Sequence, residues 1–405
     1  MRQIAFDALY ERVDATKLVT ALAPVPLVLT LASRNLIHDR IQMVGTIVGI
    51  VFSIVLVSVQ LGIYVGSERM ITQMIDRAHA DLWIVPQGAR SFEDTAMLGG
   101  PQRFQALATP GVADVTPLVA GFAKWIRPDG GSSLVMIIGV NPGDHGLQPW
   151  NMVEGSIGDL ATPNGVIVDR SYFPLLGVTS TGQWAQIRSR VSEGRVRVVG
   201  LTDLIRSFTT WPYVFTTLER SRGFLGGDLD HNTFYLVQIS AGADVEEVHR
   251  SLAADLTDAE VITPAEFHDR SLSRWLYGTG AGMALIGGAM LGVLVGTIIV
   301  AQALYMSTKE HINEFATLRA IGSSAFYIHQ VILWQALLTA VIGFCIAASL
   351  AFVITLMSAH TALPIVMTPT LTLILFALTL VMCAISAASS IIKVTRIDPA
   401  VVFTR

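Results

Sequence analysis

The chain has 405 residues, of which 52% are hydrophobic and 14% are charged, and its mean hydropathy is +0.56. Soluble globular chains carry about 25% charged residues, so this composition excludes a purely soluble protein and indicates lipid-facing segments. The net charge of −4 leaves no basic excess, which argues against a nucleic-acid-binding protein.

The N-terminal part, residues 1–42, mixes charged and apolar residues ahead of the first long apolar segment. After the break at Pro24–Val25–Pro26, leucines alternate with polar residues from Leu27 to Arg40. This pattern is typical of a helix that lies in the membrane interface. A simple extension of the first span fits less well, because Asp39 and Arg40 interrupt it. We therefore expect cytoplasmic N-terminal and interfacial helices over 1–42.

Four segments are long enough to cross a bilayer as helices, which takes about 20 apolar residues. None of them contains Asp, Glu, Lys or Arg, and a buried helix of a soluble protein would not run this long without charge. The predicted spans are Met43–Val65, Ala281–Met306, Val331–Met357 and Leu371–Ile392. The resulting boundaries are transmembrane helices over 43–66, 278–306, 331–357 and 371–392, a cytoplasmic segment over 307–330, a short outer loop over 358–370 and a cytoplasmic tail over 393–405.

Basic residues near the ends of the spans predict the orientation of the chain. They precede the first span, lie between the second and third, follow the fourth, and are absent from 358–370. These residues are Arg2, Arg12, Lys17, Arg34, Arg40, Lys309, Arg319, Lys393, Arg396 and Arg405. Cytoplasmic loops carry an excess of Lys and Arg, so both termini are expected in the cytoplasm. The long acidic segment 67–277, with 17 Lys and Arg against 24 Asp and Glu, is then outside.

Residues 67–277 alternate short β-like and helical patterns, which predicts a large extracytoplasmic α+β domain inserted between the first and second spans. The expected strands are Asp81–Val85, Leu134–Gly139, Val196–Gly200 and Phe234–Ile239. The expected helices are Phe104–Ala108, Tyr213–Phe224 and Val245–Leu256. One possible division is a part near the membrane, 67–140 plus 231–277, and an inserted part, 141–230.

The cytoplasmic segment between the second and third spans combines charge with an apolar stripe. Acidic residues lie four apart at Glu310 and Glu314, Arg319 follows, and Gly322 breaks the helix. The apolar stripe consists of Ile312, Phe315 and Leu318. An amphipathic helix of this kind suits docking into a groove on a cytoplasmic partner. The alternative is a solvated turn with ordinary helical charge pairs.

Two spans carry glycines at four-residue spacing. Gly288, Gly292 and Gly296 form a row in the second span, and Gly45 and Gly49 form a pair in the first. Small residues at this spacing allow helices in lipid to approach closely. We interpret the row in the second span as a helix-packing face, within or between protomers; glycines that merely loosen the helix are the alternative.

Just outside the first span, the side chains of Tyr64, Glu68, Met70 and Met74 include types that can act as axial ligands to a haem. A helix that continues outward, with the two methionines packing, is the favoured interpretation. Elsewhere the nine histidines are scattered, and no His-Glu-x-x-His metal motif or Gly-x-Ser-x-Gly nucleophile turn occurs. We expect no catalytic residues and no metal site.

The chain also lacks the phosphate-binding loop of transporter ATPases. Such a loop ends in Gly-Lys-Ser/Thr, and none of the four lysines follows a glycine. We therefore expect a non-catalytic chain that binds no cofactor itself, with ATP and Mg²⁺ on a separate ATPase subunit.

The pattern of four spans, a large outer domain and a short third–fourth loop resembles the MacB/FtsX-type ABC transporter permeases. The segment Glu314–Gly322 is similar to the family's coupling segment, and Arg396–Ala400 to its C-terminal signature. Within the family, the DevC-like exporter permeases are the most similar. That likeness is carried by Ala80–Val85, Gly121–Trp125, Val199–Leu201 and Gly296–Val300.

The resemblance implies a multi-pass protein of the bacterial inner (plasma) membrane with a periplasmic domain. It implies a homodimer with two separate ABC ATPase subunits, whose closure moves the outer domains, a mechanism called mechanotransmission. It further implies a membrane-fusion adaptor and a TolC-like outer-membrane protein, with contact to membrane lipid, and the lack of a basic face predicts no nucleic-acid partner.

The leading hypothesis is export of a lipid-like or amphiphilic molecule of the glycolipid class. The spans contain no charge, whereas ion-coupled transporters usually carry ionisable residues inside the membrane. The alternatives are an FtsX-like signalling permease that regulates an extracytoplasmic enzyme, and a haem exporter permease.

Overall fold

The computed structural model describes residues 25–38, 40–227, 231–359, 361 and 363–395. The chain divides into two compact units. The first comprises Met1–Tyr64, Ala284–Ala359 and Ile365–Arg405, and the second comprises Val65–Met283 and His360–Pro364. We describe each by itself and call them the helical unit and the outer unit.

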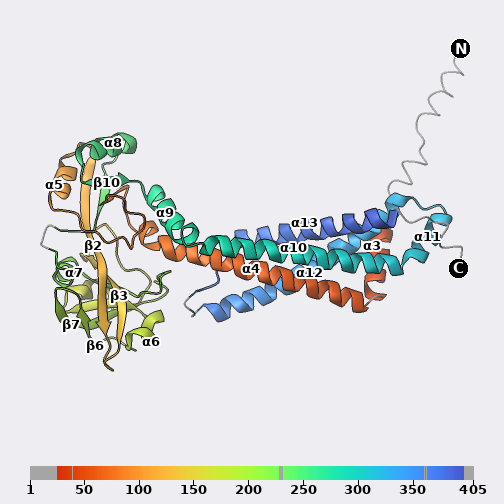
Figure 1. Ribbon diagram of the computed structural model, residues 1–405, viewed down its shortest axis with the longest axis horizontal. Helices are drawn as coiled ribbons and strands as arrows, with labels where there is room; N and C mark the ends of the chain where they lie inside the picture. The colour runs from red at the N-terminus through yellow and green to blue at the C-terminus, as the bar shows by residue number, and fades with distance from the viewer. Residues whose placement is uncertain (1–24, 39, 228–230, 360, 362, 396–405) are drawn as a thin grey trace, which may run out of the picture. The chain divides into compact units, whose positions relative to one another are not determined.

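Six helices build the described part of the helical unit (Figure 1). They are α3 (Val25–His38), α4 (Arg40–Asp76), α10 (Ala281–Glu310), α11 (Ile312–Ala320), α12 (Ala325–Ser358) and α13 (Pro369–Thr395). Four of them, α4, α10, α12 and α13, are long and apolar enough to cross a membrane, which confirms the four predicted spans. The N-terminal part expected over 1–42 is described only from residue 25, where α3 begins.

Local sequence determines where these helices begin. Ser324 accepts a hydrogen bond from the Tyr327 amide at the start of α12, as an N-cap serine does. Thr368 accepts one from the Leu371 amide at the start of α13, and Pro369 occupies the first helical position, where no amide hydrogen is needed. Only α4 runs far beyond the predicted span, because its last turns pack into the outer unit's own core.

Ten strands form one sheet in the outer unit. They are β1 (Leu82–Pro86), β2 (Val112–Ile126), β3 (Ser132–Val140), β4 (Met152–Glu154), β5 (Gly165–Asp169), β6 (Trp184–Arg188), β7 (Glu193–Thr202), β8 (Tyr213–Thr217), β9 (Phe234–Ile239) and β10 (Ala259–Ile262). Their order is β10-β1-β9-β2-β3-β8-β5-β7-β4, and β6 pairs with both β2 and β7. The strands β2, β3, β8, β5, β7 and β6 therefore close into a small barrel.

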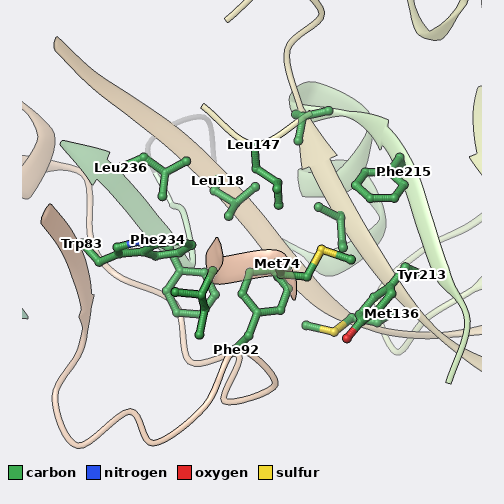
Figure 2. Close-up of a cluster of buried hydrophobic side chains, with 14 of the residues drawn as sticks. Met74, Trp83, Phe92, Leu118, Met136, Leu147, Tyr213, Phe215, Phe234 and Leu236 are labelled. Carbon is green, nitrogen blue, oxygen red and sulfur yellow. The ribbon is translucent and has the colours of Figure 1, made fainter. Parts of the chain in front are cut away.

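Three hydrophobic clusters organise this unit. One fills the barrel interior with side chains from all six of its strands, including Trp125 and Ile187. A second lies between the sheet β10-β1-β9-β2 and two helices, α5 (Pro101–Ala108) and α8 (Val245–Asp255). The third, in Figure 2, joins the opposite face of that sheet to the last turn of α4 and to α9 (Pro264–Leu272). The remaining short elements are α6 (Phe173–Leu176), α7 (Leu218–Leu225), the 3₁₀ turns Ile157–Ala161 and Arg170–Tyr172, and a π-helical turn at Ser273–Tyr277.

The outer unit confirms the predicted α+β class, with one helix misplaced. The four expected strands coincide with β1, β3, β7 and β9, and the helices with α5 and α8. The helix expected over Tyr213–Phe224 is wrong in its first half: Tyr213–Thr217 is the buried strand β8, and α7 begins only at Leu218. The possible division at residue 140 does not follow the barrel, which takes β2 and β3 from one side of it and four strands from the other.

Candidate coupling segment and helix-packing faces

The predicted coupling segment is a short, well-bounded helix. Helix α11 spans Ile312–Ala320 directly after α10, with Glu314 in its first turn, where a negative charge complements the helix dipole. It ends at Ala320, Gly322 follows with a φ of +106° that suits glycine, and the Ser323 amide donates to the Leu318 carbonyl at 3.0 Å. This is the closure expected of a glycine-terminated helix. The segment is thus held in a defined shape by its own backbone.

The apolar stripe of α11 packs against the chain's own helices. Phe315 is 4% exposed and belongs to the core of the helical unit, together with Leu304 and Ile328. Leu318 packs against the same core, and Ile312 is half-buried. An apolar stripe shows that a helix face is buried, but the partner that buries it can belong to the same chain.

The polar side of the segment remains on the surface. Between residues 309 and 322, the exposed described residues are Lys309, Glu310, Asn313, Glu314, Thr317, Ile321 and Gly322. Ile321, at 79% exposed, is the apolar residue of this surface. We call this set the polar face of α11. The predicted residue Arg319 lies in the helix, but its side chain is outside the described part, as is the segment Arg396–Ala400.

His311 is a member of the segment that the sequence interpretation missed. Its ring is buried, and its Nδ1 lies 3.1 Å from Glu314 Oε2, while the ring centroid is 6.4 Å from that of Phe315. The side chain therefore links the acidic residue on the surface to the buried anchor. The three-residue spacing between His311 and Glu314 was the available signal, because side chains three apart meet on a helix.

The glycine row of the second span packs against the first span within one chain. A Cβ atom at Gly288 would lie 2.7 Å from Gln60, one at Gly292 would lie 3.0 Å from Val57, and one at Gly296 would collide with Ser53. The Ser53 hydroxyl donates to the Gly292 carbonyl at 2.6 Å, a hydrogen bond between the two helices. Small residues and interhelical hydrogen bonds are the usual means of packing helices in lipid.

The two glycines of the first span differ in their contacts. A Cβ at Gly49 would lie 2.5 Å from Ile299, so this glycine also belongs to the contact between α4 and α10. Gly45 has no neighbour within 4 Å of such a Cβ, so within the described part of this chain it packs against no other helix. Two further close approaches were missed: Gly343 of α12 meets Ile50, and Gly62 meets Ile365.

Of the four residues considered as haem contacts, the two methionines are buried. Met74 is 1% exposed and lies among the aromatic side chains of the outer unit's core, with Trp83, Phe92 and Phe234 around it (Figure 2). Met70 is also buried. Their thioethers pack as buried side chains, as the favoured interpretation of an outward-continuing helix expects. Tyr64 and Glu68 are half-buried. Among the described residues, no group of three or more His, Cys, Asp and Glu side chains could hold a metal ion.

Family comparisons account for this combination of an α+β domain and close-packed spans. Residues 43–255, more than half of the chain, match the family model of the MacB-like periplasmic core domain. Residues 286–399 match the FtsX-like permease C-terminal domain. The chain belongs to the MacB/FtsX-type ABC transporter permeases. Members of this family are multi-pass inner-membrane permeases with a periplasmic domain, and membership implies an ABC ATPase partner and a dimer.

Solved structures similar to this chain are domains of the same kind, all of low identity. The periplasmic region of MacB from Actinobacillus actinomycetemcomitans matches 49% of this chain and 96% of its own, at 12% identity and a TM-score of 0.35. The extracellular domain of the noncanonic ABC-type transporter YknZ from Gram-positive bacteria matches 45% of this chain and 99% of its own, at 14% identity and a TM-score of 0.32. A domain of a permease protein from Porphyromonas gingivalis matches 46% of this chain and 91% of its own, at 16% identity and a TM-score of 0.32. No curated protein matches this chain.

Proposed function

We propose that this MacB/FtsX-type permease exports a lipid-like or amphiphilic molecule of the glycolipid class, as DevC-like permeases do, through an adaptor and an outer-membrane duct. ATP is hydrolysed on separate subunits that contact the polar face of α11. Both termini and this face are cytoplasmic. The chain itself supplies movement and no catalysis.

The observation that carries the proposal is the continuity of α4. This single helix of 37 residues places Ile50 and Ile54 in the core of the helical unit, and Met74 and Ile75 in the core of the outer unit. A helix whose two ends are fixed in two packed cores can transmit a displacement, because packed interiors deform little. The glycine contacts with α10 bind the same helix to the span that leaves the outer unit.

The composition of the coupling segment supports a protein partner at its polar face. Phe315 and Leu318 attach α11 to its own bundle, so movement imposed on this helix reaches the spans. This face carries two carboxylates, Glu310 and Glu314, beside one ammonium group, Lys309, and the carboxylates suit basic side chains in a partner groove. The lack of a Gly-Lys-Ser/Thr sequence in the chain supports placing ATP and Mg²⁺ on that partner.

The lack of charged residues in the spans argues against ion-coupled transport and supports export of an amphiphilic molecule. An FtsX-like signalling permease, which moves no molecule and regulates a periplasmic enzyme, uses the same coupling segment, and the match to the FtsX-like C-terminal domain fits it equally. Reconstitution of the permease with its ATPase separates the two. Stimulation of ATP hydrolysis by an added amphiphile supports export, and a lack of stimulation by any glycolipid, with ATPase activity that responds only to a periplasmic protein, supports signalling.

The docking role of α11 is tested by reversing one charge. We expect Glu314→Lys to reduce ATP-driven export by about tenfold or more, because like charges placed together at an interface cost several kcal/mol. Insertion into the membrane should be unchanged, since Glu314 is exposed. The measurements are export and ATP hydrolysis by the reconstituted complex, and co-purification of the ATPase.

The matched control is Asp258→Lys, the same charge reversal at an exposed position in the outer unit. It should leave export and co-purification unchanged. Normal export by the Glu314→Lys variant would refute the docking role, whereas equal loss in both variants would show a general effect of charge.

A further inference from the structure

The outer unit contains a polar pocket that the coupling mechanism does not use. Its volume is about 680 Å³, and its polar side chains include Arg77, His79, Asp144, His145, Trp150 and Gln238. They come from three places: the segment after α4, the loop between β3 and β4, and strand β9. Ligand pockets in proteins commonly measure about 300–1,000 Å³ and contain a few convergent polar groups.

Hydrogen bonds and packing within the chain hold the walls of this pocket. In the β3–β4 loop, Leu147 is buried in the core, and the Gln148 amide donates to the carbonyls of Asn141 at 2.7 Å and Asp144 at 3.3 Å. Gly146 lies so close to β2 that a Cβ would be 2.9 Å from Thr116. Across the pocket, the Gln238 amide donates to the His79 carbonyl at 3.3 Å. Such preorganisation lowers the entropic cost of binding.

The pocket is rich in hydrogen-bond donors that have no partner in the described part of the chain. The Arg77 guanidinium lies over the Trp150 ring, 5.8 Å from its centroid, and forms no salt bridge or hydrogen bond with described residues. The rings of His79 and His145 are exposed and likewise form no hydrogen bond there. Stacking on an aromatic face orients a guanidinium and leaves its N–H groups available for a ligand.

These donors fit an anionic group, and a metal ion fits poorly. No set of three metal-binding side chains occurs among the described residues, so the histidines and Asp144 do not form a metal site there. A planar guanidinium binds phosphate or carboxylate with two parallel hydrogen bonds. Asp144 contributes the one carboxylate among the described residues that line the pocket. That carboxylate repels a bare anion but accepts a hydrogen bond from a donor group on the same ligand.

We propose that this pocket binds a small phosphate-bearing head group that also carries an ammonium or hydroxyl group. Arg77, with His79 and His145, holds the phosphate, and Asp144 accepts from the ammonium or hydroxyl. The identification of this head group with part of the exported molecule rests on the proposed function. The binding itself does not, because it requires neither the ATPase nor transport.

Calorimetric titration of the full chain in detergent tests the site with three probes: inorganic phosphate, phosphoethanolamine and short-chain phosphatidylethanolamine. We expect phosphoethanolamine to bind and Arg77→Gln to weaken it about tenfold or more, since a hydrogen bond to a charged group is worth about 1.5–3 kcal/mol. Arg77→Lys should lie between the wild type and Arg77→Gln. Arg69→Gln is the matched control, an exposed arginine two turns earlier on α4 that does not line the pocket.

The role of Asp144 gives a second, opposite readout. Asp144→Asn should weaken phosphoethanolamine binding but strengthen binding of inorganic phosphate, because it removes an acceptor for the ammonium group and a repulsive charge for the anion. Tighter binding of the short-chain lipid than of phosphoethanolamine identifies an amphiphile as the source of the head group, and equal binding identifies a soluble one. Absence of phosphoethanolamine binding at millimolar concentration, or equal binding by Arg77→Gln and the Arg69→Gln control, overturns the proposal. Binding without ATP-driven export would refute the proposed function alone.

Discussion

The helical unit and the outer unit are packed by different means, although α4 contributes to both. In the helical unit the closest contacts involve glycines, alanines and a serine: Gly296 meets Ser53, and Ala340 and Ala387 are fully buried. In the outer unit the core consists of large aromatic side chains, including Trp83 and Phe267. Lipid tails are as apolar as leucine, so helices in lipid gain little from burying large side chains and rely on close approach. In water, burial of aromatic surface is the main source of stability.

Removal of an aromatic side chain from the outer unit should have the largest effect on stability and tests how the packing of the two units differs. Trp83 is 0% exposed and contacts Phe92, Phe234 and Phe267 with ring centroids 5.2–6.4 Å away. Trp83→Ala should destabilise the outer unit by about 3–5 kcal/mol, through lost burial and the cavity that remains. Amide hydrogen exchange on the full chain should show faster exchange in β1 and β9 and unchanged exchange in α12 and α13.

Trp83→Phe is the matched variant for this test. The Trp83 Nε1 is buried without a hydrogen-bond partner among the described residues, so phenylalanine loses volume but also removes an unsatisfied donor. It should therefore cost much less than alanine. Equal exchange rates in the two variants would show that aromatic packing does not determine the stability of this unit.

The next effect concerns close approach in the helical unit. Gly296→Leu should lower the melting temperature of the chain in detergent, because the added side chain would collide with Ser53 and Met382. Overpacking of a tight contact costs about 1–3 kcal/mol, and more where the helices separate. Gly287→Leu, in the same helix, has no neighbour within 4 Å of its Cβ and is the control. If both variants melt alike, the glycine row does not hold α4 against α10.

The sequence predicts the parts of this fold that depend on local chemistry. Lipid requires about 20 uncharged residues for each span, so the four spans are visible directly. The stripe of Val248 and Leu252 in α8 and the strand pattern of β9 are local as well. The barrel is different: β2 joins β6 through pairs such as Lys124 with Arg188, and such distant pairing leaves no periodic mark in one sequence.

The same limit applies to the candidate sites. The apolar stripe of α11 predicts correctly that one face is buried, but nothing local to it indicates that Phe315 packs on its own bundle. The spacing of Gly288, Gly292 and Gly296 predicts a helix contact without identifying Ser53 and Gln60 as its other side. The pocket around Arg77 unites segments that lie more than 150 residues apart in the chain, from Arg77 to Gln238, so only the fold reveals it.

The smallest effect concerns a buried carboxyl group, Glu93, in the aromatic core of the outer unit. Glu93 is 8% exposed, accepts a hydrogen bond from Trp275 Nε1 at 3.0 Å, and lies 3.4 Å from the Tyr213 hydroxyl. Burial raises the pKa of Glu93 above its usual 4.5, and the two hydrogen bonds only partly oppose this shift. The folded state therefore binds the proton more tightly than the unfolded state. This contribution to stability is fully present below pH 4.5 and is lost as pH rises through the raised pKa.

Glu93→Gln keeps an acceptor for Trp275 and removes the charge. The variant should match the wild type in stability near pH 4 and exceed it near pH 8. Near pH 8 the wild-type Glu93 carboxyl must either be buried as a charge or hold a proton well above its unfolded pKa, and both cost free energy of folding that glutamine does not. Amide hydrogen exchange of β8 and the π-helical turn Ser273–Tyr277 at the two pH values measures the difference. Glu247→Gln, at an exposed position on α8, should show no such crossover with pH. A constant difference between Glu93→Gln and wild type across this range would mean that the pKa of Glu93 is the same in the folded and unfolded states, and that the core of the outer unit is more polar around this carboxylate than its aromatic lining indicates.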